Sequence, residues 1–135
     1  MEDTKSKIYL SWENIEELVD FICDKFKERK FSSDSIMGLP RGGLIPAVML
    51  SHKLNLPLVF EPTRKTLIVD DICDSGKTFL EIIKLHPYNM VVSLHFKPQT
   101  SKFIPDLYGC TLTSDDWLVY PWENRDAKAI QDYLK

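Results

Sequence analysis

One stretch, TLIVDDICDSGKT from Thr66 to Thr78, constrains the fold more than any other part of the chain. It opens with Thr66–Val69, which is aliphatic or β-branched throughout, as is typical of a strand buried on both faces of a parallel sheet. Asp70, Asp71 and Asp74 follow, and a helix is predicted to begin near Lys77. The stretch therefore predicts a strand, a loop that carries three carboxylates, and a helix.

This arrangement of acids and helix start favours a phosphorylated sugar as the ligand. Backbone N–H groups at a helix N-terminus bind anions, so residues 75–78, with the hydroxyls of Ser75 and Thr78, suit a phosphate monoester. Asp70 and Asp71 suit sugar hydroxyls or a hydrated Mg²⁺ ion, which prefers carboxylates together with substrate oxygens. A sugar phosphate with free hydroxyls satisfies both requirements.

Two other interpretations of the stretch are weaker. The end of the run resembles the end of a P-loop, but Asp71 stands where that motif requires glycine. A plain strand followed by a helix capped by Asp74 or Ser75 would explain one acid, but it would leave the other acids at the strand end unexplained.

The whole run resembles the phosphoribosyl-pyrophosphate (PRPP) signature of type I phosphoribosyltransferases. That signature is an aliphatic strand followed by two acids, any two residues, Asp, a small residue, Gly, any residue and Thr. The required positions are occupied here by Asp70, Asp71, Asp74, Gly76 and Thr78. The resemblance implies that residues 74–78, Asp74, Ser75, Gly76, Lys77 and Thr78, bind the 5′-phosphate of PRPP. It also implies that Asp70 and Asp71 hold the ribose hydroxyls and Mg²⁺, partly through water and substrate, and that Asp74 is the catalytic base.

A second strand–loop–helix unit precedes this one. Residues 35–39 read as a central strand, Pro40-Arg41-Gly42-Gly43 as a loop, and residues 44–54 as a helix. The glycines let the backbone approach a ligand and Arg41 suits bidentate phosphate contact, although a plain helix start would also fit the loop taken alone. The loop resembles the small-Arg-Gly-Gly pyrophosphate loop of the same family, from which Pro40 departs, and this resemblance implies that Arg41, Gly42 and Gly43 bind PRPP.

The final third resembles the base-binding end of hypoxanthine and xanthine-guanine phosphoribosyltransferases. The resemblance rests on Phe96-Lys97-Pro98 and on the Trp-x-x-x-Pro-Trp-acid ending from Trp117 to Glu123. It implies that Lys97 donates to the 6-oxo group of a purine, that Trp117 stacks on the ring, and that the backbone near Leu118 reads the exocyclic groups. Without it, Lys97 would be read as solvated and both tryptophans as packing residues; for Trp122 packing is the expectation.

The rest of the chain completes an α/β pattern. A short lead-in at 8–10 could form an edge strand, and a helix is expected over residues 11–30. A third buried strand is expected over 57–60, followed by a helix over 77–86 that buries Leu80, Ile83 and Phe79. Further strands are expected over 90–96 and 108–112, and a helical tail over 124–135. Alternation of strands and helices predicts a doubly wound, mainly parallel sheet. With 135 residues, one phosphoribosyltransferase-like domain with a small C-terminal base-binding segment at about 97–123 is the simplest organisation.

Composition argues against nucleic-acid binding and a membrane span, and it bears on the cellular compartment. The net charge of −3 gives no electrostatic footprint for nucleic acid, and no apolar run reaches membrane-spanning length. The charged N-terminus has no apolar signal core, which predicts a cytoplasmic protein. Three widely spaced cysteines predict neither a disulfide framework nor a zinc site, and Cys73 reads as a small filler residue.

The resemblance implies transfer of the phosphoribosyl group of PRPP to a 6-oxopurine with Mg²⁺ as cofactor, in a homo-oligomer, either a dimer or a tetramer. One feature departs from the family. Residues 61–65, between the third and the signature strands, are too few for the flexible loop that excludes water from such sites. Two explanations stay open: a minimal enzyme that reacts slowly or borrows cover from a neighbouring subunit, or a regulatory protein that senses PRPP or a nucleotide with little or no transfer.

Overall fold

The structure, a computed structural model, describes residues 6–124, so the expected helical tail beyond Asn124 lies outside the described residues. The elements are β1 (Lys7–Tyr9), α1 (Trp12–Glu28), β2 (Ser35–Gly38), α2 (Leu44–Leu54), β3 (Thr66–Cys73), α3 (Lys77–Leu85), β4 (Val91–Phe96), β5 (Leu107–Thr111) and β6 (Trp117–Val119). A capping box at Ser11 starts α1, and a left-handed Asn55 ends α2, as the sequence patterns require.

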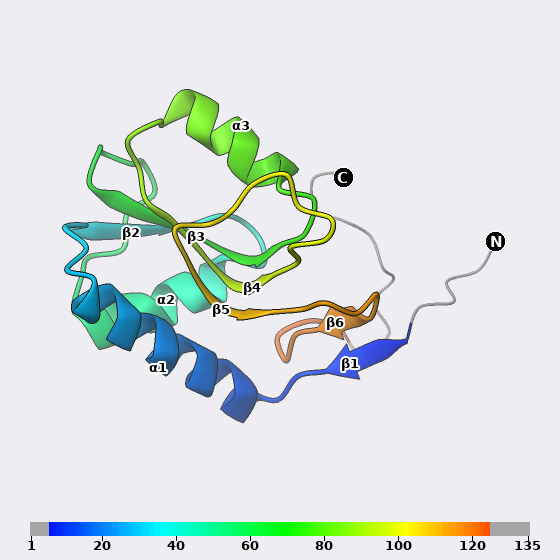
Figure 1. The fold of residues 1–135 in the computed structure, drawn as a ribbon. Helices are drawn as coiled ribbons and strands as arrows, with labels where there is room; N and C mark the ends of the chain where they lie inside the picture. The colour runs from blue at the N-terminus through cyan, green and yellow to red at the C-terminus, as the bar shows by residue number, and fades with distance from the viewer. Residues whose placement is uncertain (1–5, 125–135) are drawn as a thin grey trace.

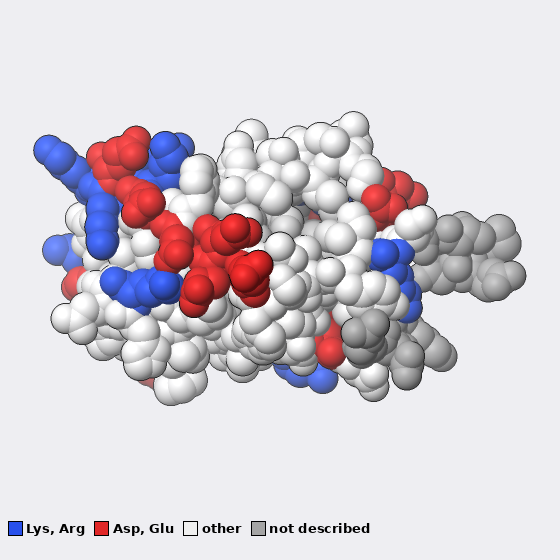
Figure 2. Space-filling view, turned by 90° about the horizontal axis from the view of Figure 1, so that it is seen from below, with Lys and Arg blue, Asp and Glu red and all other residues white. Residues whose placement is uncertain are grey.

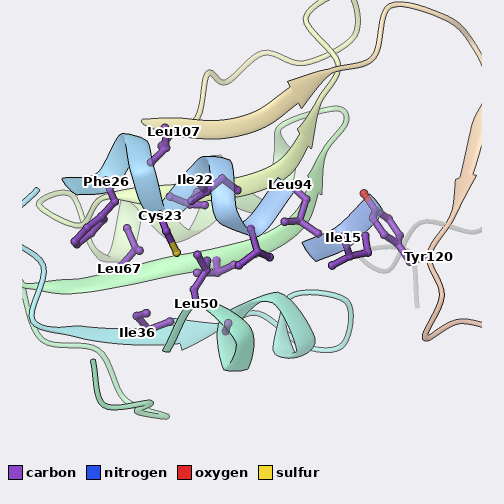
Figure 3. Packing of buried hydrophobic residues seen from close by; sticks show 14 of the residues in the cluster. Ile15, Ile22, Cys23, Phe26, Ile36, Leu50, Leu67, Leu94, Leu107 and Tyr120 are labelled. Atoms are coloured by element: carbon purple, nitrogen blue, oxygen red, sulfur yellow. The ribbon is translucent and has the colours of Figure 1, made fainter. Parts of the chain in front are cut away.

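The main sheet has four parallel strands in the order β2-β3-β4-β5. Helices α1 and α2 lie on one face of this sheet and α3 on the other (Figure 1). The larger core fills the space between the helix pair and the sheet, where Ile22 of α1, Leu50 of α2 and Leu67 of β3 are fully buried (Figure 3). The expected doubly wound parallel fold is confirmed.

The sheet reverses its strand order beside β2. Backbone bonds of 2.9 and 2.8 Å join Ile36 to Pro57 and Val59, which places residues 57–59 on the outer side of β2. Helix α2 thus leads outward from β2 to this edge, and the chain then returns to β3 on the inner side. The loops at the carboxyl ends of β2 and β3 therefore flank the point at which the strand order reverses, the position at which such sheets bind ligands.

Two expectations about packing are wrong. The third buried strand at residues 57–60 is an edge segment with a single bridge, and Phe60 is 80% exposed. Flanking prolines cannot donate ladder hydrogen bonds, which limits pairing there. On α3, Phe79 is buried but Leu80 is 37% exposed and Ile83 is only half-buried, because the helix turns Phe79 toward the sheet.

A small parallel sheet lies beside the main one. It pairs β1 with β6, so that Ile8 opposes Leu118, and the lead-in strand expected near Ile8 is confirmed. The amide N–H of Trp117 donates to Ser6 and that of Leu10 donates to Val119, at 2.8 and 2.9 Å. The N-terminal strand therefore holds the segment that the sequence assigns to base binding.

The outer face of α1 is acidic. Figure 2 shows Asp and Glu side chains gathered on the face that includes this helix, where Glu16, Asp20 and Asp24 are exposed. Asp20 forms a 2.7 Å ion pair with Lys53 of α2. Such a face would repel a phosphate backbone, and it is the solvent-exposed side of the helix. Among residues 6–124, none of the helices combines the length and the apolar character that a membrane crossing requires.

Candidate active site

One solvent-open cleft lies at the carboxyl ends of β3 and β4. Its walls are formed by three segments: residues 70–79, Lys97, and the β6 segment with Trp117, Leu118, Tyr120 and Glu123. The signature loop and the base-binding segment, which lie far apart in the sequence, therefore face the same space.

The start of α3 has the form of an anion site. Gly76 is the N-cap, with a left-handed φ of 82°, and it has no side chain to cap the helix, while Ser75 Oγ accepts from the Lys77 amide at 3.2 Å. A Cβ at this position would stand 2.7 Å from Ser101 Oγ and 2.8 Å from the Phe103 nitrogen, so glycine is required by conformation and by space. Because the amides of the first helical turn have no partner within the helix, this loop is suited to hold a phosphate.

The paired acids lie within β3, which extends through them to Cys73 instead of ending at Val69 as the sequence suggested. Asp70 Oδ1 accepts from the Asp71 amide at 2.9 Å, and Asp71 Oδ1 accepts from the Ile72 amide at 2.7 Å. Asp71 is only 8% exposed. Local backbone bonds thus fix both carboxylates at the wall of the cleft.

The loop after β2 reaches the same acids from the other side. Gly42 is packed so closely on Asp71 that a Cβ would stand 2.5 Å from its carboxylate carbon, and a Cβ on Gly43 would stand 2.9 Å from Asp70 Cα. The Pro40–Arg41 peptide bond is cis. Arg41 is exposed and lies outside the lining of the cleft. The two loops therefore meet at Asp70 and Asp71, while Gly42 and Gly43, like Arg41, are not among the residues that line the cleft.

Asp74 and Lys97 face each other across the cleft wall. Lys97 Nζ lies 3.7 Å from Asp74 Oδ2, and Lys97 is only 5% exposed. Thr100 Oγ1 lies 2.9 Å from both Asp74 Oδ1 and the Asp74 carbonyl oxygen, to which it can donate. A buried ammonium group needs an anionic partner, and here that partner is the predicted catalytic base. The structure thus brings together the residues predicted for base binding and for proton transfer.

The aromatic residues of the last segment separate into two roles. Trp117 is half-buried and Leu118 is 7% exposed, and both line the cleft. Trp122 lies outside this lining: its ring stacks on Tyr120 at 4.8 Å and contacts Trp12 at 5.9 Å. The expectation that Trp122 is a packing residue agrees with these contacts.

Sequence reasoning missed several residues of the site. Thr100 and Ser101, in the polar stretch after β4, support the signature loop, and the amide of Lys102 donates to the Ser75 carbonyl at 2.9 Å. Tyr120 also lines the cleft, and no local pattern marks it. Cys73 is buried, and burial raises the pKa of its thiol to about 11, which agrees with its reading as a filler.

The donor set fits Mg²⁺ better than a metal held by protein alone. Within the described part of the chain, no three His, Cys, Asp or Glu side chains converge on one metal position. Mg²⁺ is commonly held by one or two carboxylates together with water and substrate phosphates, and Asp70 and Asp71 provide such a pair at the cleft.

A doubly wound parallel sheet whose signature loop, paired acids and C-terminal aromatic segment line one cleft is the arrangement of the type I phosphoribosyltransferase class. No protein-family model matches the chain. The xanthine-guanine phosphoribosyltransferase of Chromohalobacter salexigens is 27% identical over 136 residues, covering 84% of this chain and 82% of that protein. The crystal structure of a purine phosphoribosyltransferase from Pyrococcus horikoshii superposes with a TM-score of 0.76 at 30% identity, covering 93% of this chain and 98% of that one.

The Helicobacter pylori xanthine-guanine-hypoxanthine phosphoribosyltransferase shares the fold, with a TM-score of 0.74 at 18% identity over 87% of this chain and 93% of that one. Taken with the Pyrococcus likeness, these matches show that the chain belongs to the type I phosphoribosyltransferase family, nearest to its hypoxanthine and xanthine-guanine members.

Proposed function

We propose that the chain transfers the phosphoribosyl group of PRPP to a 6-oxopurine (guanine, xanthine or hypoxanthine) and releases pyrophosphate. The observation that carries this proposal is the shared cleft, in which Lys97 and Trp117 face the acids and phosphate loop of residues 70–78. The relatives are named for purine or xanthine-guanine substrates, which favours transfer over the regulatory alternative.

On the base side, Lys97 and Trp117 select the acceptor. The ammonium group of Lys97 donates to a 6-oxo group, whereas the 6-amino group of adenine offers it no acceptor. Trp117 provides a flat apolar surface for the purine ring, and the Leu118 backbone reads the exocyclic groups. Lys97 is already buried against Asp74, so little side-chain entropy is lost when the purine binds.

On the ribose-phosphate side, the loop from Asp74 to Thr78 anchors the 5′-phosphate, while Asp70 and Asp71 hold the ribose hydroxyls. Arg41, Gly42 and Gly43 hold the pyrophosphate as its negative charge increases. Mg²⁺, when bound through Asp70, Asp71, water and substrate, supplies further charge stabilisation. As the bond from the ribose anomeric carbon to pyrophosphate breaks and a purine nitrogen bonds to that carbon, Asp74 accepts the purine proton.

The same proposal extends to the oligomeric state, the compartment and the rate of turnover. Membership of the family supports a homo-oligomer that works on small molecules in the cytoplasm. Residues 63–65 lie at the amino ends of the strands, because the Asp34 amide donates to Lys65 and Asn89 Nδ2 donates to Thr63, at 2.9 and 2.7 Å. The five-residue connection that includes them therefore turns away from the cleft, and turnover is expected to be slow.

The test is an activity panel. The protein is incubated with PRPP, Mg²⁺ and, in turn, guanine, xanthine, hypoxanthine, adenine and uracil, and nucleotide and pyrophosphate are measured. We expect product with at least one 6-oxopurine, and Asp74→Asn should reduce its rate by about 10² to 10⁴-fold, the range for a lost general base. Nucleotide binding without turnover would refute transfer, and preferential use of uracil would refute the assigned base.

A further inference from the structure

A buried polar contact links both sides of the cleft through Tyr120. The Tyr120 hydroxyl lies 2.8 Å from His95 Nδ1 and donates to the Asp71 carbonyl oxygen at 3.2 Å. Tyr120 is 3% exposed and His95 is 4% exposed. A hydroxyl so far from solvent needs its hydrogen bonds from protein groups, and these two satisfy it.

The direction of each hydrogen bond follows from the number of protons. A tyrosine hydroxyl has one proton, and a backbone carbonyl oxygen can only accept. The Tyr120 hydroxyl therefore donates its hydrogen bond to the Asp71 carbonyl oxygen. His95 Nδ1 must then carry a proton and donate to the hydroxyl oxygen. Burial lowers the pKa of His95 to about 4, so the imidazole is neutral near pH 7 and has a single ring proton, which the two hydrogen bonds of Tyr120 assign to Nδ1.

These contacts join three segments that carry different parts of the site. Asp71 is one of the paired acids of β3, His95 lies in β4 two residues before Lys97, and Tyr120 follows β6. The Tyr120 amide also donates to Glu123 Oε1 at 2.9 Å, and its ring lies at the end of the core beside Ile15 (Figure 3). One side chain therefore ties the base segment to the strand that bears the paired acids.

From this geometry we infer that Tyr120 is a positioning residue that fixes the distance between the base side and the ribose-phosphate side of the cleft. This inference rests on the proposed function. A ligand that occupies only one side gains nothing from that fixed distance, whereas a nucleoside monophosphate and the transition state span both sides. The hydroxyl should therefore strengthen binding of spanning ligands and raise kcat.

The experiment compares the intact protein with Tyr120→Phe, which removes only the hydroxyl. Calorimetry measures the Kd values of PRPP and of GMP, and steady-state kinetics measures kcat. We expect the Kd of GMP to rise and kcat to fall by about tenfold, the size of one lost hydrogen bond, with the Kd of PRPP within about twofold. Tyr108→Phe is the control, because the Tyr108 ring packs on Phe96 at 4.9 Å outside the cleft lining and should leave all three values unchanged.

Two results would overturn the inference. Unchanged GMP affinity and kcat in Tyr120→Phe would show that the hydroxyl does not position the site. Equal losses of PRPP and GMP affinity, accompanied by a lower melting temperature, would show a merely structural role. If the wild-type protein bound both ligands but transferred to no purine, the proposed function would fail, and the two Kd values would still decide the role of Tyr120.

Discussion

Gly42→Ala should strongly reduce catalysis while the sheet remains folded. Gly42 is buried, and a Cβ there would stand 2.5 Å from Asp71 Cγ and 3.0 Å from Asp71 Oδ1. The backbone at Gly42 is not left-handed, so the added methyl group and not strain in φ is the perturbation. Either the Asp71 carboxylate or the loop after β2 must move to make room.

The size of that movement sets the expected loss. Ordinary contacts begin near 3.4 Å, and Asp71 Oδ2 stands nearer to the added methyl group than the carboxylate carbon does, so the methyl group and the carboxylate must separate by at least about 1 Å. A misplacement of about 1 Å at a catalytic site can cost about 10²-fold in rate. Crowding of a packed site costs about 1–3 kcal/mol in the free energy of unfolding. We therefore expect kcat to fall about 10²-fold in a protein that still folds.

Steady-state kinetics with PRPP and guanine, paired with urea unfolding, measures both effects. Gly109→Ala in β5 is the matched control, because its Cβ would stand 2.6 Å from the Leu94 carbonyl oxygen and 3.0 Å from Leu18, outside the cleft lining. It should lower stability similarly and leave kcat near the wild-type value. A Gly42→Ala protein whose kcat and KM for PRPP stay within about twofold of wild type would refute the assigned role of Asp71 or its contact with Gly42.

Two further outcomes concern Lys97 and His95. In Lys97→Ala we expect kcat/KM for 6-oxopurines to fall by about 10- to 150-fold, as for a lost charge-assisted hydrogen bond, with the KM for PRPP nearly unchanged; unchanged base kinetics would contradict the assignment. Burial lowers the pKa of His95 from 6.5 to about 4, so the unfolded chain takes up a proton first as the pH falls, and stability is lost between pH 6.5 and 4. Urea unfolding should show a loss of about 3 kcal/mol across that window that His95→Gln lacks, and equal pH dependence in both proteins would contradict it.

Local patterns were enough to predict the two strand–loop–helix units that meet at Asp70 and Asp71. The aliphatic run before Asp70 predicted β3, and the predicted helix over 44–54 coincides with α2. These elements depend on residues close in sequence: strand composition, a glycine where φ is positive, and a helix period. Because both units are strand, loop and helix in parallel order, the meeting of their loops followed from topology alone.

Packing beyond the local period was not predictable. The segment at residues 57–60 has the composition of a buried strand, but it occupies the sheet edge, and only the order of the strands determines that. The Tyr120 hydroxyl contacts partners 25 and 49 residues earlier in the chain, His95 belongs to no recognised motif, and Tyr120 occupies an unspecified position of the Trp117–Glu123 ending. The prediction that Leu80 is buried was wrong for a related reason, since the rotation of α3 on the sheet decides which apolar side chain is covered.

The short connection before β3 changes what must protect the reacting carbon from water. Thr63 is held at the amino end of β3 by the bond from its amide to Thr66 Oγ1 at 2.9 Å, so this segment cannot close over a cleft at the carboxyl end. Under the proposed function, the bound purine itself is then the nearest group that shields the ribose carbon on its attacking face. Its shielding depends on how firmly Lys97 and Trp117 are held relative to Asp70 and Asp71. The Tyr120 contact, which joins these groups through β3, therefore matters more in this chain than it would beneath a closing loop.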